Sequence, residues 1–199
     1  MIRIGILGGT FDPVHIGHIE IAKSAMRQCS LAQVRVMTAG IPPHKRDKKT
    51  TPSRMRYKMT ELAISGEAGL FADDYELKKS EYSYTANTLC ELKKLHPEWD
   101  IYFIIGEDSL RDLHLWYKPE VIVRNCTLLV YPRKAGSNIN DFKAMYEEKM
   151  GAEIIIIDAP EIDVSSTEIR EKIKNGESAD GLLPEKVMEY IRETGLYRT

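Results

Sequence analysis

The sequence has few of the features that mark a secreted or membrane protein. It contains three cysteines among 199 residues, Cys29, Cys90 and Cys126, which are widely spaced and form no C-x-x-C pair. An odd, scattered set of cysteines excludes a disulfide framework and a zinc-ligand pattern, and indicates small core residues in a reducing compartment. No apolar run is long enough to span a bilayer, and the first one is too short for a signal peptide. We therefore expect a soluble, cytoplasmic protein with no membrane partner.

The chain also lacks an excess of charge of one sign. Its 28 Lys and Arg residues are balanced by 30 Asp and Glu residues, so the formal net charge at pH 7 is −2. A protein without net positive charge has no overall attraction to nucleic acid or to an anionic membrane. We expect no nucleic-acid partner, and the sequence leaves open whether the chain forms a homo-oligomer.

Apolar runs alternate with amphipathic segments along the whole chain. The expected strands are Ile2–Leu7, Val34–Met37, Gly69–Leu77, Ile101–Gly106, Thr127–Tyr131 and Glu153–Ile157. The expected helices between them include one from Gly17 to about Cys29, one from Thr51-Pro52 and one from Ser83 or Thr85, and Trp99 is expected to end a helix as a packing residue. Strands separated by helices pair in parallel through right-handed crossovers. This pattern predicts one α/β domain over residues 1–199, a doubly wound, Rossmann-like parallel sheet with helices on both faces. A short helical C-terminal part is expected over about residues 165–199.

The most informative segment follows the first expected strand and reads GGTFDPVHIGH, from Gly8 to His18. Glycines let backbone N–H groups approach phosphate oxygens, and a helix N-terminus adds partial positive charge. His15 and His18 add ring donors. The segment lacks the Gly-Lys-Ser/Thr of a P-loop and the G-x-G-x-x-G of a dinucleotide fold. It indicates a site for a nucleoside triphosphate.

Two other interpretations of this segment compete. The two histidines, three residues apart, could bind a metal with Asp12 as a third ligand. Alternatively, the glycines could form an ordinary turn and the histidines could lie on the surface. The eleven-residue context is far more demanding than a histidine pair, and it favours phosphate.

Other unusual clusters also follow expected strands, and ligands of such sheets lie beyond the carboxyl ends of the strands. The clusters are Pro42–Lys45, Gly106–Asp108, Pro132-Arg133 and Ser165–Thr167. His44 and Lys45 open a basic stretch that includes Arg54 and Arg56 and that mostly fits a solvated loop. Two prolines stiffen the backbone before His44 and Lys45, so these two are the candidates for a substrate phosphate.

The segment that begins at Ser165 has two readings. Ser165 with Glu168 three residues later fits a capping box. A hydroxyl-rich helix start at Ser166 and Thr167, with Arg170 in the first turn, also fits an anion clamp. Together with the histidine segment, it would hold one triphosphate between two helix N-termini.

Trp116 lies beyond the Gly106–Asp108 cluster, in an apolar neighbourhood. A tryptophan in such a place is usually a core residue. Because this stretch belongs to the expected ligand-binding edge, stacking of the indole on a flat ring is a serious alternative.

The whole chain resembles the bacterial nicotinate-nucleotide adenylyltransferase family, within the nucleotidyltransferase superfamily whose HIGH motif is here His15-Ile16-Gly17-His18. The matching segments are GGTFDPVHIGH, Pro42–Lys45, Ser83–Thr85, Gly106–Asp108, Trp116-Tyr117, Val164–Arg170, and Leu183-Pro184 to Leu196-Tyr197. The first segment is shared with relatives such as pantetheine-phosphate adenylyltransferase, and the combination is more specific. Val164 and Asn87 depart from the usual pattern, outside the expected chemistry.

The resemblance implies transfer of AMP from ATP to nicotinate mononucleotide in NAD biosynthesis, with Mg²⁺ as a cofactor held mainly by phosphates and no metal ligands from the protein. The catalytic residues that it implies are His18, His15 and Arg170. The ATP-binding residues that it implies are Gly8, Gly9, Thr10, His15, His18, Gly106, Asp108, Ser165, Ser166, Thr167 and Arg170. The residues that it implies for the mononucleotide are Thr85, Trp116 and Tyr117 around the pyridine ring, and His44, Lys45 and Arg133 at the phosphate.

The expected pyridine pocket offers donors and has no acidic residue within Ser83–Thr85 or Leu115–Tyr117, although acids from elsewhere could enter it. Donors suit a carboxylate, so we expect a preference for the acid over the amide. Two alternatives remain: a nucleotidyltransferase for phosphopantetheine or another phosphate, and a module that senses ATP without turnover.

Overall fold

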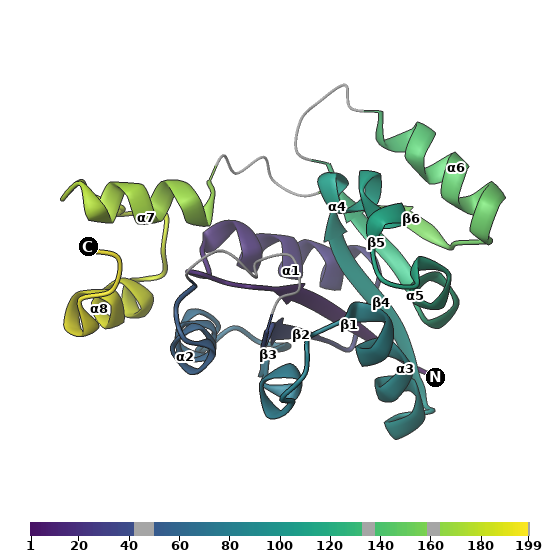
Figure 1. The fold of residues 1–199 in the computed structure, drawn as a ribbon, viewed down its shortest axis with the longest axis horizontal. Coiled ribbons are helices and arrows are strands. Elements are labelled where there is room, and N and C mark those ends of the chain that lie inside the picture. Colours follow the sequence, from purple (N-terminus) through teal and green to yellow (C-terminus); the bar gives the residue numbers. More distant parts are fainter. Residues whose placement is uncertain (42–49, 133–137, 159–163, 199) are drawn as a thin grey trace.

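The computed structural model describes residues 1–41, 50–132, 138–158 and 164–198. Within these ranges one parallel sheet has the strand order β3-β2-β1-β4-β5-β6. The strands are β1 (Ile2–Gly9), β2 (Gln33–Thr38), β3 (Leu70–Asp73), β4 (Trp99–Gly106), β5 (Thr127–Tyr131) and β6 (Ile154–Ile156). Figure 1 shows this sheet between two sets of helices. The predicted doubly wound α/β fold is confirmed.

The sheet is buried on both faces, which explains the continuous apolar runs of its strands. Successive side chains of a strand point to opposite faces. In β4, Ile104 belongs to one core cluster, whereas Phe103 and Ile105 belong to the other. A strand buried on both sides therefore needs apolar residues at every position, as parallel sheets usually do.

One face of the sheet is covered by α1 (Ile16–Gln28), α2 (Ser53–Ala63), α7 (Ser166–Lys174) and α8 (Glu185–Thr194). The other face is covered by α3 (Thr85–Leu95), α4 (Glu107–Arg111), α5 (Pro119–Asn125) and α6 (Ile139–Met150), with two short 3₁₀ helices, η2 (Tyr75–Lys78) and η3 (Leu113–Leu115). No helix among the described residues is both long and apolar enough to cross a membrane.

The third strand is shorter than the predicted Gly69–Leu77. It ends at Asp73, and the Oδ1 atom of Asp73 accepts the backbone N–H of Tyr75 at 2.8 Å. An aspartate that bonds the backbone two residues later turns the chain. The segment after Asp73 therefore forms η2 instead of continuing the strand.

The expectation that Trp99 ends a helix is wrong. Helix α3 ends at Leu95, and Trp99 begins β4. Its expected packing role is confirmed, because Trp99 is buried and its ring stacks on His96 with 3.8 Å between centroids.

Strand register brings the carboxyl ends of the central strands together. Gly8 of β1 pairs with Met37 of β2, and Leu7 of β1 pairs with Ile104 of β4. The segments that follow these strands therefore start from one edge of the sheet.

Candidate active site

The loop after β1 makes a tight turn over the edge of the sheet. Phe11 has a φ of 50° and is buried. A Cβ atom on Gly9 would lie 2.7 Å from the ring of Phe11, so any larger residue at this position would displace the ring. Glycine at position 9 is therefore required by the packing of the loop itself.

Arg56 of α2 holds this loop against the loop after β2. The Arg56 side chain is buried, and its guanidinium group donates hydrogen bonds to the carbonyl oxygens of Thr10 (2.6 Å), Ala39 (2.8 Å), Gly40 (3.0 Å) and Thr51 (2.8 Å). Burial lowers the pKa of Arg56, although an arginine remains protonated in proteins. The solvated-loop interpretation of the basic stretch is wrong for Arg56.

His15 and His18 lie side by side at the start of α1. Their rings stack with 3.7 Å between centroids, and His15 is buried while His18 is half-buried. The backbone N–H of His15 donates to Nδ1 of His18 at 3.2 Å. Since Nδ1 accepts this bond, the neutral ring carries its proton on Nε2. His18 is thereby a hydrogen-bond donor through Nε2.

The N-terminus of α7 docks onto the same loop. Ser166 donates its hydroxyl to the carbonyl oxygen of Pro13 at 2.8 Å, and Arg170 donates to the carbonyl oxygen of Asp12 at 2.7 Å. The predicted capping role of Ser165 is confirmed, because its Oγ accepts the backbone N–H of Glu168 at 3.1 Å. The two helix starts therefore meet at the turn that contains Asp12.

The carboxylate of Asp12 joins three segments. Its Oδ2 accepts the backbone N–H of Thr51 at 3.1 Å, and its Oδ1 accepts the hydroxyl of Tyr197 at 2.7 Å. Burial raises the pKa of Tyr197 above its ordinary value, so the phenol remains a donor. These bonds argue against Asp12 as a third metal ligand beside the histidines. No cluster of three or more His, Cys, Asp or Glu residues among the described residues could hold a metal ion.

A cavity of about 260 Å³ opens beside the loop. Gly8, Gly9 and Thr10 line one part of it, and Thr85, Trp116 and Tyr117 line another. The structure therefore brings the expected ATP loop and the expected pyridine pocket into one cavity.

The aromatic wall of the cavity is built by two ring pairs. Trp116 contacts Phe103 edge to face with 6.4 Å between centroids, and Tyr84 lies 4.6 Å from Tyr117 by the same measure. Trp116 also packs against the core cluster on this face of the sheet. The core and ring-stacking interpretations of Trp116 are thus compatible.

Glu76 of η2 also lines the cavity, and sequence reasoning did not place it there. The Glu76 side chain is buried, and its Oε1 accepts the hydroxyl of Thr88 at 2.8 Å. Burial raises the pKa of Glu76, while hydrogen bonds from Thr88 and Ser83 oppose this shift. Nothing in the sequence indicated this position, because Glu76 fell within the expected polar strand Gly69–Leu77, where an acid would face solvent.

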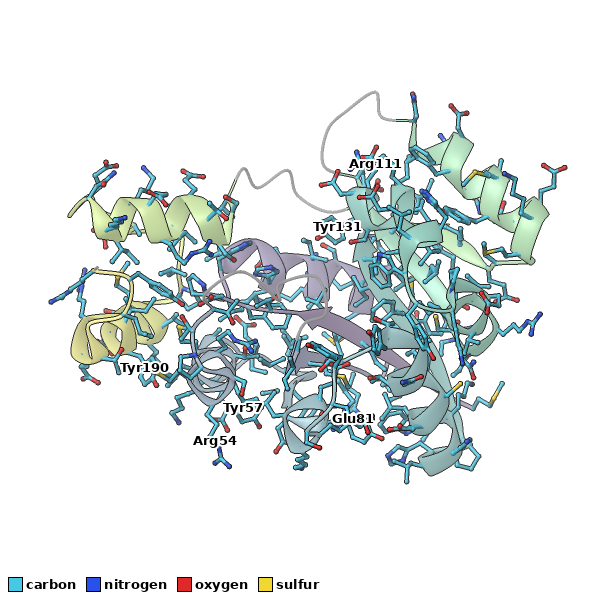
Figure 2. The ribbon with its side chains drawn as sticks, viewed as in Figure 1. Arg54, Tyr57, Glu81, Arg111, Tyr131 and Tyr190 are labelled. Carbon is cyan, nitrogen blue, oxygen red and sulfur yellow. The ribbon has the colours of Figure 1, made fainter. Side chains whose placement is uncertain are left out.

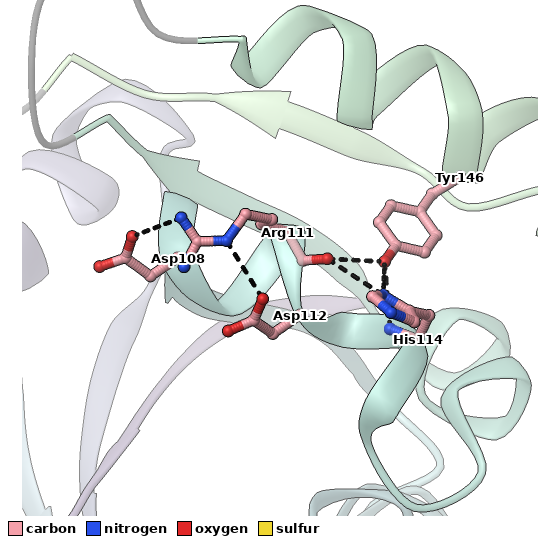
Figure 3. Close-up of polar contacts among 5 residues, drawn as sticks. All are labelled: Asp108, Arg111, Asp112, His114 and Tyr146. Atoms are coloured by element: carbon pink, nitrogen blue, oxygen red, sulfur yellow. Dashed lines mark hydrogen bonds and ion pairs between the residues drawn. The ribbon is translucent and has the colours of Figure 1, made fainter.

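Gly106 is the last residue of β4, and Asp108 follows it in α4. A Cβ atom on Gly106 would lie 3.1 Å from the ring of Tyr131, which is labelled at the end of β5 in Figure 2, so glycine allows a close approach. Figure 3 shows Arg111 of α4 between Asp108, at 3.4 Å, and Asp112, at 3.1 Å. These exposed ion pairs are weak, so a ligand could displace Arg111 from Asp108 at small cost.

The corner that carries Asp108 is anchored from α6. The hydroxyl of Tyr146 accepts the backbone N–H of His114 at 3.0 Å and donates to the carbonyl oxygen of Arg111 at 3.3 Å (Figure 3). Tyr146 is buried. The remaining expected residues, His44, Lys45 and Arg133, lie outside the described residues.

The fold and this edge of the sheet define a nucleotidyltransferase. The family model described as cytidylyltransferase-like matches residues 6–172. The chain is 42% identical, over the full length of both chains, to a protein of Clostridium tetani named "Probable nicotinate-nucleotide adenylyltransferase". A Dehalococcoides mccartyi protein of the same name is 40% identical, with 98% of this chain and 97% of the relative covered. The chain belongs to the nicotinate-nucleotide adenylyltransferase family.

Solved structures agree on the fold. A nicotinic acid mononucleotide adenylyltransferase of Plasmodium falciparum, solved in complex with NaAD, superposes with a TM-score of 0.82 at 22% identity. The alignment covers 99% of this chain and 98% of the other. The same protein in complex with APC gives a TM-score of 0.81.

Proposed function

We propose that this chain transfers the AMP group of ATP to nicotinate mononucleotide and releases pyrophosphate, as a step of NAD biosynthesis. One observation carries the proposal: Gly8, Gly9 and Thr10 of the GGTFDPVHIGH segment line the same cavity as the aromatic side chains of Trp116 and Tyr117. A nucleoside triphosphate on the loop and a flat ring in the pocket would therefore be adjacent. The names of the relatives point to the same pair of substrates.

The attacking group in this reaction needs no general base, because the phosphate of the mononucleotide is already ionised at neutral pH. Catalysis then consists of placing the two substrates in line and of neutralising the charge on departing pyrophosphate. The His18 Nε2–H group, the loop N–H groups and the guanidinium of Arg170 are suitable donors for this charge. His15 fixes the His18 ring through its backbone N–H.

Mg²⁺ would reach this site together with ATP. The groups at the loop are N–H donors, imidazoles and a guanidinium, which bind phosphate oxygens and not a hard cation. The ion would supply charge neutralisation, and His18, the loop N–H groups and Arg170 would hold the phosphates.

We propose the remaining assignments on the support of their positions in the fold and of the family pattern. Gly106 and Asp108 lie at the end of β4, where they suit the adenosine ribose. Ser165, Ser166 and Thr167 suit the outer phosphates. For His44, Lys45 and Arg133, contact with the mononucleotide phosphate is supported by the family pattern alone. We also propose a single domain over residues 1–199 that works in the cytoplasm.

Release of pyrophosphate from ATP and Mg²⁺ tests the proposed function. Nicotinate mononucleotide, nicotinamide mononucleotide and phosphopantetheine are compared as acceptors under identical conditions. We expect the highest kcat/KM with nicotinate mononucleotide, since donors at the start of α3 suit its carboxylate. A preference for phosphopantetheine would identify a different transferase, and ATP binding without release would identify a sensor.

A further inference from the structure

The cavity combines aromatic walls with a single charged group. Tyr84, Trp116, Tyr117 and Phe103 line it, and Glu76 is the one carboxylate or cationic side chain among the described residues that do so. Electron-rich ring faces attract cations, and a carboxylate does so more strongly. This combination suits a flat ring that carries a positive charge.

Glu76 is held in place by three elements. Its Oε1 accepts the hydroxyl of Thr88 in α3. The hydroxyl of Ser83 also stabilises the carboxylate, and the Oγ of Ser83 accepts the backbone N–H of Gly40 at 3.1 Å, just beyond β2. A Cβ atom on Gly40 would lie 2.4 Å from the carbonyl oxygen of Glu76, so η2 packs directly on this loop. The carboxylate therefore has little freedom to leave the cavity.

No cation among the described residues forms an ion pair with Glu76. Lys79, on the same segment, pairs instead with Glu91 of α3, which also accepts the hydroxyl of Tyr75. The positive charge of Lys79 lowers the pKa of Glu76 without an ion pair, and the negative charge of Asp73 raises it. A buried carboxylate that lacks a contacting cation is costly unless a ligand supplies that charge.

We propose that Glu76 is the counter-ion of the pyridinium ring of the mononucleotide. This inference rests on the proposed function. The ring nitrogen of a pyridine mononucleotide is bonded to ribose, so the ring is a cation whether its substituent is an acid or an amide. Glu76 therefore selects for the oxidised pyridinium ring, and the choice between acid and amide is made elsewhere, toward Thr85, one helical turn before Thr88.

The test compares nicotinate mononucleotide with its reduced, dihydropyridine form, which has the same phosphate and carboxylate but an uncharged ring. Glu76→Gln removes the charge and keeps an acceptor for Thr88. We expect it to raise the KM for the oxidised substrate about tenfold, to leave kcat nearly unchanged, and to leave the dissociation constant of the reduced form unchanged. Glu91→Gln is the matched control, because it removes a carboxylate from the same η2–α3 contact, outside the cavity, and should change neither value.

If Glu76→Gln weakened the binding of the oxidised and the reduced mononucleotide equally, the proposal would be overturned and Glu76 would have a packing role. Unchanged binding of both forms would also overturn it. The unmodified protein gives a second readout that requires no variant: it should bind the oxidised form more tightly than the reduced form, and the reverse order contradicts the proposal. Failure of the unmodified protein to use nicotinate mononucleotide would instead refute the proposed function.

Discussion

The backbone of His15 determines how His18 can act. Its N–H group donates to Nδ1 of His18, so the ring presents Nε2–H as its donor. The tautomer is thus set by the capping of α1, within the four residues His15-Ile16-Gly17-His18. A side chain with one nitrogen fixed in this way loses little freedom when it binds a phosphate oxygen.

We expect His18→Ala to lower kcat by about a hundredfold or more, because it removes a donor to the departing pyrophosphate. His96→Ala is the control, since it removes a ring at the opposite end of α3 from the cavity. Steady-state pyrophosphate release measures both variants. A kcat within a few-fold of the parent for His18→Ala would show that the ring has no part in the chemistry.

The raised pKa of Glu76 predicts a pH-dependent stability. Above the folded-state pKa the buried carboxylate is ionised, and its desolvation opposes folding. As the pH falls through that pKa toward the ordinary value, Glu76 takes up a proton in the folded state and the penalty disappears. Glu76→Gln should therefore have a higher Tm than the parent at pH 7, with a difference that shrinks at acidic pH.

Thermal unfolding of both proteins from pH 4.5 to pH 7.5 measures this difference. The other titrating groups are common to both proteins, so their contributions to the difference in Tm cancel. A difference that grows at acidic pH would contradict the assignment of a buried, ionised Glu76.

Single residues were predictable from sequence where a local pattern constrains them. His15, His18 and the capping Ser165 belong to short motifs that a reader can recognise. Arg56 and Glu76 do not, because their burial depends on partners that are distant along the chain. Arg56 belongs to a basic stretch of sequence, which is typical of a solvated loop. Its burial follows from carbonyl partners in two separate loops, which the local sequence does not indicate.

At the scale of elements, α2 acts through one buried cation. The Arg56 guanidinium group donates hydrogen bonds to carbonyl groups in both of the loops that follow β1 and β2. These two loops contribute Thr10 and Ala39 to the cavity wall. Helix α2 therefore supports the cavity indirectly, through the hydrogen bonds that Arg56 donates to the two loops.

Arg56→Met keeps an unbranched side chain in place of the arginine stem and removes all of its donors. We expect a loss of about 3 kcal/mol in the free energy of unfolding, because several buried carbonyl groups lose a charged donor. The KM for ATP should rise as well. Urea unfolding and ATP kinetics measure the two effects.

Arg54→Met is the matched control. Figure 2 shows Arg54 on the same helix, directed away from the molecule, and its side chain is exposed. We expect a change within about 0.5 kcal/mol. Equal destabilisation by both substitutions would mean that charge on α2, and not the carbonyl bonds, stabilises the fold.

Most helices and strands were predictable from the hydrophobic pattern of the sequence, since β4 and β5, for example, are continuous apolar runs. The failures occurred at polar segments. The strand ending at Asp73 was overextended because the turn depends on one side-chain bond to Tyr75. Trp99 was misassigned because a tryptophan beside Pro97 fits a helix end as well as a strand start.

At the scale of the whole molecule, the C-terminal helices complete the phosphate loop. Helices α7 and α8 lie beyond α1 and α2 in Figure 1 and share the core cluster of that face through Ile169, Val187 and Ile191. The chain then returns to Asp12 through the hydroxyl of Tyr197. The loop after β1, near the N-terminus, is thus held by residues of the C-terminal part, Arg170 and Tyr197.

Tyr197→Phe removes this hydroxyl and leaves one carboxylate oxygen of Asp12 without its donor. We expect a loss of about 1–3 kcal/mol in stability and weaker ATP binding, measured by thermal unfolding and calorimetry. Tyr190→Phe on α8, labelled in Figure 2, is the control and should change neither value. Unaltered ATP affinity in Tyr197→Phe would show that Asp12 keeps its position without the C-terminus.

The doubly wound parallel architecture and the family were predictable from sequence, because they follow from alternation and from extended motifs. The contact between residue 197 and residue 12 was not. It joins two positions 185 residues apart, and no local pattern encodes such a pair.

This long connection has a consequence for synthesis on the ribosome. The GGTFDPVHIGH loop emerges before the groups that hold its Asp12 turn, because Arg170 and Tyr197 lie 158 and 185 positions later. A nascent chain can pair β1 with β2 early, and it must wait for β4 to fill the centre of the sheet. The loop after β1 therefore gains its last contacts late, and we expect a chain that stops before Tyr197 to bind ATP more weakly than residues 1–199.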